Sequence, residues 1–207
     1  AATAEAGARF LAIDVAADNR DALRFLLSQG FRFRGDTWAL LLPAAAGLPA
    51  PAWPDGYTAR PYAGAADLPR YTALCNQTFG DLWGHWENTP GLVDEAHMAE
   101  TLAQFDPRGV FLVFDATGAA VAHCRAQAAG DEQSPHVLDQ PGVIPAHRAA
   151  GLHAPLALTA AHWLRAQAAR PIRLESWGDA AATIAGYEAL GFALAEHEVS
   201  YVREVAA

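Results

Sequence analysis

The chain has 207 residues, of which 52% are hydrophobic, and a formal net charge of −9. This length suits one domain of about 150 residues with an extension, or two small domains, and either can bury a core. The acidic balance disfavours nucleic acid as a partner, because phosphate binding needs a basic surface. No apolar run approaches the ~20 residues that span a bilayer, and no signal peptide is visible, so no membrane partner is expected.

Cys75 and Cys124 are the two cysteines of the sequence. Two thiols make neither a disulfide framework nor a cysteine-rich zinc site, so we expect no metal. The plain interpretation is a cytoplasmic protein whose thiols are reduced and buried in its core.

The first elements along the chain form a predicted strand–helix–strand unit over residues 11–42. Leu11 to Val15 reads as a strand, a helix opens near Asp18 and ends before Gly30, and a second strand runs to Leu42. The segment 43–54 is rich in Pro and Ala, and it predicts a semi-extended linker because proline continues neither a helix nor a central strand.

The rest of the sequence predicts strands and helices in the order β–α–α–β–β–β–α–β–α–β, and so an α/β chain. The expected ranges are strand 57–61, helices 66–79 and 93–105, strands 110–114, 120–126 and 137–143, helix 150–164, strand 172–177, a helix from 179 to 190, and strand 192–203.

A turn between a strand and a helix is the most informative stretch of the sequence. The strand ends at Val143, a tight turn contains Arg148 and Gly151, and helical spacing of apolar residues follows. The first N–H groups of a helix lack partners and the helix dipole adds positive potential, so this turn predicts an anion site, with Arg148 as an added cation. His153 either crowds an anion there or, as a cation, holds it. Pro155 is harmless if it lies in the first turn.

A second signature follows the strand 172–177. Asp179 is expected to cap a helix that contains Tyr187, Gly191 fits the left-handed position after the helix, and Phe192 begins the last strand.

These two segments resemble the GNAT superfamily of N-acetyltransferases. Its acyl-coenzyme A loop reads V-x-P-x-x-R-G-x-G-x-G/A, which Val143, Pro145, Arg148 and Gly151 match, whereas Ala149 and His153 depart from it. Its ending reads N-x-x-A-x-x-x-Y-x-x-x-G-F, in which the usual Asn falls at Ala180.

The resemblance implies the GNAT fold, an α/β (α+β) fold whose mixed central sheet carries helices on both faces. It also implies that acetyl-coenzyme A is the co-substrate and that an acetyl group moves to an amine, on a small molecule or a peptide, of unknown identity. The residues expected to bind coenzyme A are Val143, Ile144, Arg148, Ala149, Ala150, Gly151, Leu152, His153, Ala154 and Asp179.

The resemblance makes Tyr187 the acid that protonates the departing coenzyme A thiolate, and Asp139 the candidate base. Competing bases are His85, His123, His136 and Glu175, and direct attack by the amine with water relaying the proton needs no dedicated base. Tyr187 can equally be a packed ring with a satisfied hydroxyl. The acceptor is expected at residues 79–87, where Trp83 and Trp86 either line a pocket or pack over the sheet.

The sequence also contains an internal repeat. Placing Gly30 on Gly191 gives an offset of 191 − 30 = 161, which places Asp18 on Asp179 and Leu26 on Tyr187. Residues 1–45 are therefore interpreted as a partial second unit of the same superfamily, 46–56 as a linker and 57–207 as the acetyltransferase domain. A homodimer is one expected assembly. Two alternatives stay open, a non-catalytic ligand-binding or dimerising module and an O-acyltransferase.

Overall fold

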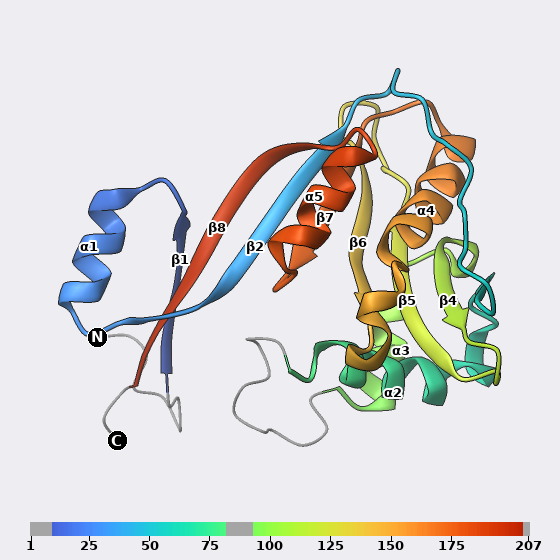
Figure 1. The fold of residues 1–207 in the computed structure, drawn as a ribbon, viewed down its shortest axis with the longest axis horizontal. Coiled ribbons are helices and arrows are strands. Elements are labelled where there is room, and N and C mark those ends of the chain that lie inside the picture. The colour runs from blue at the N-terminus through green and yellow to red at the C-terminus, as the bar shows by residue number, and fades with distance from the viewer. Residues whose placement is uncertain (1–9, 82–92, 205–207) are drawn as a thin grey trace.

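A single eight-stranded sheet organises the computed structural model, which describes residues 10–81 and 93–204. The strand order is β1-β8-β2-β7-β6-β5-β4-β3, and β6 and β7 run parallel while the other neighbouring strands run antiparallel (Figure 1). The strands are β1 (Phe10–Ala16), β2 (Arg32–Leu42), β3 (Thr58–Pro61), β4 (Val110–Phe114), β5 (Ala120–Gln127), β6 (His136–Val143), β7 (Ile172–Trp177) and β8 (Ala193–Glu204).

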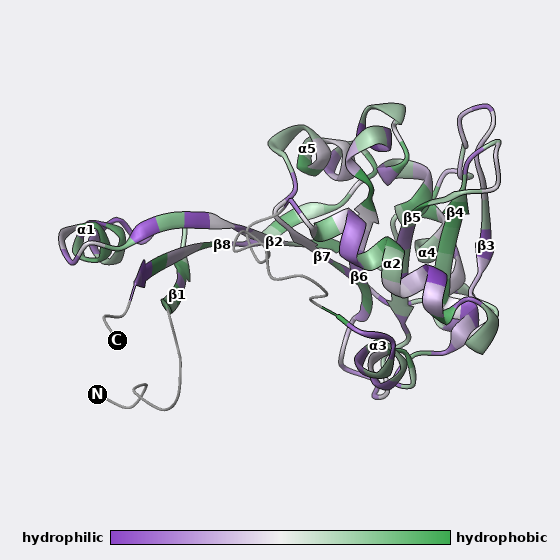
Figure 2. Cartoon of the chain, turned by 90° about the horizontal axis from the view of Figure 1, so that it is seen from below, coloured by the Kyte–Doolittle hydropathy of each residue, from purple (hydrophilic) through white to green (hydrophobic). Residues whose placement is uncertain are grey.

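Helices cover both faces of this mixed sheet, as predicted. The helices α4 (His153–Gln167) and α5 (Ala181–Ala189) pack on one face, and α2 (Leu68–Phe79) and α3 (Glu95–Leu102) cover the other. Figure 2 shows α5 and α3 on opposite sides of the sheet, and it shows β4 and β5 as largely hydrophobic. The core beneath α4 includes the fully buried side chains of Leu40, Leu42, Leu138, Leu156, Leu164, Ile172 and Leu174.

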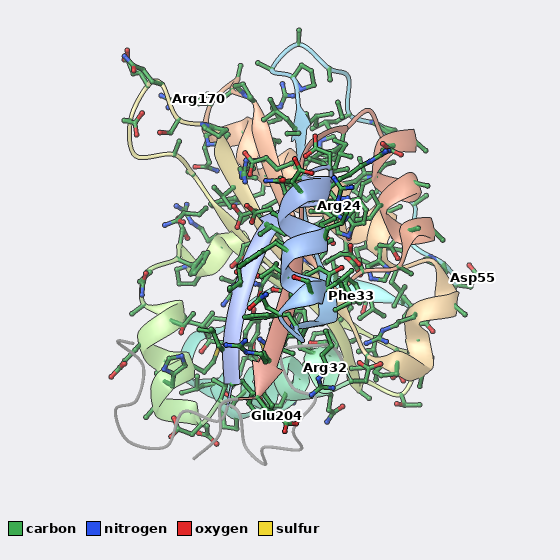
Figure 3. The ribbon with its side chains drawn as sticks, turned by 90° about the vertical axis from the view of Figure 1, so that its left-hand side faces the viewer. Arg24, Arg32, Phe33, Asp55, Arg170 and Glu204 are labelled. Carbon is green, nitrogen blue, oxygen red and sulfur yellow. The ribbon has the colours of Figure 1, made fainter. Side chains whose placement is uncertain are left out.

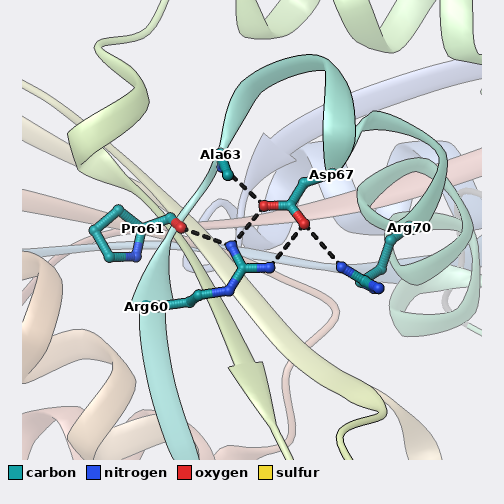
Figure 4. Close-up of polar contacts among 5 residues, drawn as sticks. All are labelled: Arg60, Pro61, Ala63, Asp67 and Arg70. Atoms are coloured by element: carbon teal, nitrogen blue, oxygen red, sulfur yellow. Dashed lines mark hydrogen bonds and ion pairs between the residues drawn. The ribbon is translucent and has the colours of Figure 1, made fainter.

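A buried carboxylate fastens the start of α2 to the edge of the sheet (Figure 4). Asp67 accepts two hydrogen bonds from Arg60 on β3, at 2.5 and 2.8 Å, one from Arg70 at 2.9 Å, and one from the backbone N–H of Ala63 at 2.8 Å. These donors hold the pKa of Asp67 well below its usual range. The cluster therefore fixes where α2 crosses the sheet.

The N-terminal strand–helix–strand unit is part of the same sheet. Its strand β2 lies between β7 and β8, and its strand β1 pairs with β8 at the sheet edge, so this unit folds against the rest of the chain. The helix α1 (Arg20–Ser28) connects β1 and β2, with the side chain of Asn19 as its N-cap. The sequence predicted the elements but not the insertion of β2 between two later strands.

The pairing registers repeat with the offset of 161 seen in the sequence. Ile13 pairs with Tyr201 between β1 and β8, and the equivalent pair, Leu174 with Leu40, occurs between β7 and β2. Thr37 of β2 pairs with Glu198 of β8, and these two paired residues are themselves 161 positions apart. The two units are thus related by a local two-fold arrangement in the backbone pairing.

Two predicted helix starts differ from the structure. Ala180, without a side-chain bond, is the N-cap of α5, so the predicted cap by Asp179 is wrong; its carboxylate accepts a hydrogen bond from Ser176 at 2.6 Å instead. Residues 145–150 form a 3-10 turn, so α4 begins at His153 rather than at 150. Gly151 separates turn and helix with φ 74°, a left-handed conformation that glycine adopts at little cost. Pro155 does lie in the first turn of α4.

Candidate active site

A cleft opens where β6 and β7 separate. Their parallel pairing ends at Asp139 with Glu175, and Gln140 then takes a left-handed conformation with φ 45°. The register with β5 also shifts here, which is a β-bulge that bends β6 away from its neighbour. The cleft has a volume of about 400 Å³ and is lined by Thr78, Phe79, Pro141, Gly142, Val143, Arg148, Ala149, His153, Gly178, Asp179, Ala180 and Thr183.

The side of this cleft formed by β6 lies directly against α2. A Cβ at Gly142 would lie 3.0 Å from Nε2 of His123, 3.1 Å from Oγ1 of Thr78 and 3.2 Å from the ring of Phe79. Glycine therefore allows the backbone of β6 to approach the end of α2 closely. His123 is itself buried and bonded to Thr78 at 2.9 Å and to the hydroxyl of Tyr71 at 3.2 Å.

Arg148 lies at one end of the cleft, at the turn that the sequence singled out. Its Nε donates to the carbonyl of Val143 at 3.2 Å, and Nη2 donates to the carbonyl of Thr78 at 3.0 Å. Nη1 and Nη2 also donate to the two carboxylate oxygens of Asp81 at 2.6 and 2.7 Å. This bidentate pair lowers the pKa of Asp81 and raises that of Arg148. The sequence indicated Arg148, but not its partner 67 residues earlier.

A partly buried His–Asp pair also lines the cleft. Nε2 of His153 is 3.7 Å from Oδ1 of Asp179. Burial raises the pKa of Asp179 to about 6 and lowers the pKa of His153 to about 4, the latter with help from the charge of Arg148. At neutral pH Asp179 is therefore ionised and His153 is neutral, which argues against His153 as a cation for phosphate.

Tyr187 is fully buried, and its hydroxyl has no hydrogen-bond partner among residues 10–81 and 93–204. Burial raises its pKa well above the usual value, with a contribution from the charge of Asp179. Tyr187, Arg148 and His153 line a cavity of about 240 Å³, together with Gly151, Ala154, Ala182, Thr183 and Gly186. An unpaired buried hydroxyl costs about 1–3 kcal/mol, so this position suits a ligand atom that the hydroxyl can bind.

The predicted coenzyme A residues fall into two groups. Val143, Arg148, Ala149, His153 and Asp179 line the cleft, and Gly151 and Ala154 line the adjoining cavity. The other three line neither space: the side chains of Ile144 and Ala150 pack against the core, and Leu152 is fully buried in it.

The candidate base Asp139 lies beside the cleft but does not line it. Its carboxylate pairs with Arg125 at 2.6 Å, and burial raises its pKa. Of its competitors, His123 has a pKa lowered to about 3 by burial, and His136 is bonded to the N–H of Ala129 and the carbonyl of Ala168. Glu175 pairs with Arg173, and His85 lies outside the described residues.

Two further cavities meet each other at Gln140 and Trp177, beside the cleft. One, of about 260 Å³, lies over β7, β2 and β8 and includes Arg173, Glu175, Glu196 and Glu198. The other, of about 290 Å³, lies between α2, α3 and the sheet. Phe79, from the predicted acceptor region, lines this second cavity and the cleft, while residues 82–87 of that region lie outside the described residues. Proline and glycine at 141 and 142 were the sequence signals that could have indicated this junction.

In the described part of the chain, no three His, Cys, Asp or Glu side chains are grouped closely enough to hold a metal ion. Within residues 10–81 and 93–204, no helix combines the length and apolar character needed to cross a bilayer.

Sequence comparison finds relatives of one kind, although no protein-family model matches the chain. A mycothiol acetyltransferase of Segniliparus rotundus is 30% identical over 161 residues, which are 75% of this chain and 59% of the relative. A mycothiol acetyltransferase of Nocardia farcinica is 30% identical over 181 residues, which are 83% of this chain and 57% of the relative. The chain thus spans somewhat more than half the length of these curated relatives.

The fold has a counterpart of known structure. A GCN5-related N-acetyltransferase of Sphaerobacter thermophilus superposes with a TM-score of 0.75 and 19% identity, over 96% of this chain and 60% of that one. The overall fold is shared with this neighbour, and the sequence relatives are acetyltransferases by name. The chain therefore has the fold of the GNAT N-acetyltransferases and is related in sequence to proteins named as acetyltransferases.

Proposed function

We propose that this chain transfers an acetyl group from acetyl-coenzyme A to an amine. The observation that carries the proposal is the buried hydroxyl of Tyr187, which has no hydrogen-bond partner in the described part of the chain and lies on a cavity shared with Arg148 at the predicted anion-binding turn. One site therefore combines a proton donor and a cation beside a helix start.

The residues present fit a coenzyme A donor. Arg148 and the first N–H groups of α4 suit its phosphates, because those donors lack acceptors within the helix. The edge of β6 beyond Asp139 is not paired with β7, so the backbone at Gly142 and Val143 can bond to the amides of a pantetheine arm. The hydroxyl of Tyr187 suits the sulfur.

Acetyl-coenzyme A supplies a thioester whose carbonyl carbon an amine attacks; the C–N bond forms and the C–S bond breaks. In this site Tyr187 donates its proton to the departing sulfur. A tyrosine hydroxyl is protonated at neutral pH, so the proton is available when the sulfur leaves. Asp139 is the proposed acceptor of the amine proton through water. Its raised pKa makes it a stronger base, and Gln140 next to it faces both acceptor-side cavities.

The amine is proposed to enter through the two cavities that share Gln140 and Trp177, one of which also shares Phe79 with the cleft; this favours a small molecule or a peptide terminus. Compounds related to mycothiol belong in the acceptor panel because of the relatives' name. The repeated pairing register supports the further proposal that residues 10–42 are the end of a second GNAT unit, followed by the linker and the acetyltransferase domain.

The test is release of free thiol from acetyl-coenzyme A in the presence of a panel of amines. We expect amine-dependent release and a product whose mass increases by one acetyl group and which resists hydroxylamine, because an amide survives where an ester is cleaved. A hydroxylamine-labile product would indicate O-acylation. Coenzyme A binding without release for any amine would favour the alternative of a non-catalytic module.

A further inference from the structure

We propose that Asp81 competes with the donor's phosphates for Arg148 and thereby sets the affinity for coenzyme A. The inference rests on the proposed function and adds a residue that lowers donor affinity. Asp81 follows the end of α2, and its carboxylate accepts hydrogen bonds from both terminal nitrogens of Arg148, at 2.6 and 2.7 Å. A carboxylate and a phosphate each bind a guanidinium through two oxygens, and both use the same pair of N–H donors.

The hydrogen bonds of Arg148 leave little for a second anion. A guanidinium has five N–H donors. One is used by the carbonyl of Val143, one by the carbonyl of Thr78, and two by Asp81. A single N–H on Nη1 is left, so a phosphate cannot bind in the bidentate manner while Asp81 stays. When Asp81 moves away, the N–H donors of Nη1 and Nη2 that it occupied become available to a phosphate. The hydrogen bonds to the carbonyls of Val143 and Thr78 still orient the guanidinium.

The charges of the cleft also disfavour a phosphate while Asp81 is paired with Arg148. Arg148 is the one guanidinium among the described residues that line the cleft, and the same lining contains Asp179. His153 has its pKa lowered to about 4 and is neutral at pH 7, whereas Asp179, with a pKa of about 6, is ionised. With Asp81 in place, one positive and two negative side chains meet at this end of the cleft. A phosphate group is then repelled until Asp81 withdraws.

Asp81 is placed so that it can withdraw. Its side chain is 48% exposed and that of Arg148 is 34% exposed. Ion pairs this exposed are weak because water screens them and because two side chains must be held in place. A phosphate carries more charge and more acceptor oxygens than a carboxylate, and nearby helix N–H groups add to its binding. The phosphate therefore replaces Asp81, at a cost in affinity equal to the strength of the lost pair.

The test is calorimetric titration with coenzyme A of the wild-type chain and of Asp81→Asn, which keeps the shape and removes the charge. We expect Asp81→Asn to bind about two- to fivefold more tightly, the upper part of the range that corresponds to an exposed ion pair. Pantetheine, which lacks the phosphates, should bind both proteins equally. Asp106→Asn is the matched control, because it makes the same charge change at the exposed Asp106–Arg108 pair, whose residues do not line the cleft.

A double variant makes the assignment specific. In the Arg148→Ala background, Asp81→Asn should no longer change coenzyme A affinity, because the competition needs the guanidinium. Unchanged or weaker binding by Asp81→Asn, or an equal gain for pantetheine, would overturn the inference while leaving the proposed donor intact. Absence of coenzyme A binding by the wild-type chain would overturn both.

Discussion

The two strand–helix–strand units of this chain share a backbone pattern but differ in what surrounds them. In the C-terminal unit, β7 has the parallel strand β6 as a neighbour, α5 packs beside α4, and Tyr187 is fully buried. In the N-terminal unit, β1 is the edge strand of the sheet, and Leu26 takes the position equivalent to Tyr187.

The difference is visible on the surface of the N-terminal unit. Phe25 and Leu27 of α1 and Phe33 of β2 are each more than half exposed. Figure 3 shows Phe33 on the side of the molecule where α1 faces the viewer. The cleft at β6 and β7 is therefore completed by a neighbouring strand that parts from β7 and by a second helix, α4, which have no counterpart beside β1 in the described part of the chain. The predictions below test this contrast, from the largest expected effect to the smallest.

Removal of one hydroxyl should have the largest effect, if the C-terminal unit contains the acid. Tyr187→Phe keeps the ring and removes the proton donor, and a positioned acid contributes about 10²–10⁴-fold, so we expect kcat to fall by that factor. Affinity for coenzyme A should change little. Steady-state kinetics with an accepted amine measure both, and Tyr201→Phe on β8, which does not line the cleft, is the control. A Tyr187→Phe enzyme within twofold of wild type would mean that this ring only packs.

Equivalent core positions should differ in their contribution to stability. Leu174 is fully buried, whereas its counterpart Ile13 on the edge strand is only partly buried. Leu174→Ala should lower the free energy of unfolding by about 2–5 kcal/mol, since it leaves a cavity in the core. Ile13→Ala should cost less than half as much. Urea unfolding of both variants gives the comparison, and equal losses would show that the N-terminal unit is packed as tightly as the C-terminal one.

The equivalent carboxylates Asp179 and Asp18 should differ in their effect on pH dependence. Burial raises the pKa of Asp179 from 3.8 to about 6, so ionising it destabilises the folded chain, increasingly from about pH 4 to pH 6. His153, with its pKa lowered to about 4, acts oppositely over much of this range, because protonating it at low pH destabilises the fold.

Asp179→Asn removes the destabilisation caused by ionising Asp179 and leaves the destabilisation caused by protonating His153. Relative to wild type it should gain up to about 3 kcal/mol in unfolding free energy between pH 4 and pH 7. Asp18 is exposed, and Asp18→Asn is the matched control because it makes the same charge change away from the cleft. Urea unfolding at both pH values measures the two differences, and a gain for Asp179→Asn that is the same at pH 4 and pH 7 would contradict the assigned cause.

Local patterns predicted the elements of this fold well, because their signals lie close together in the chain. Strand 172–177 was placed correctly, and Gly191 ends α5 with a left-handed φ of 95°. The repeat at an offset of 161 was visible in Gly30 and Gly191, and the strand registers follow it.

Contacts between distant segments were beyond such patterns. The pairing of Asp81 with Arg148 and the position of β2 between β7 and β8 depend on segments far apart in the sequence. The cap predicted at Asp179 was wrong because tertiary structure offered its carboxylate another donor, Ser176. The roles of Tyr187 and Asp139 stay predictions.

The central claim, that the cleft of the C-terminal unit binds coenzyme A through its phosphates, is tested most directly by calorimetry on Arg148→Ala. A hydrogen bond to a charged group contributes about 1.5–3 kcal/mol, so the dissociation constant for coenzyme A should rise at least about tenfold. Arg108→Ala, at an exposed arginine that does not line the cleft, should bind like wild type. Equal affinity of wild type and Arg148→Ala for coenzyme A would contradict the claim.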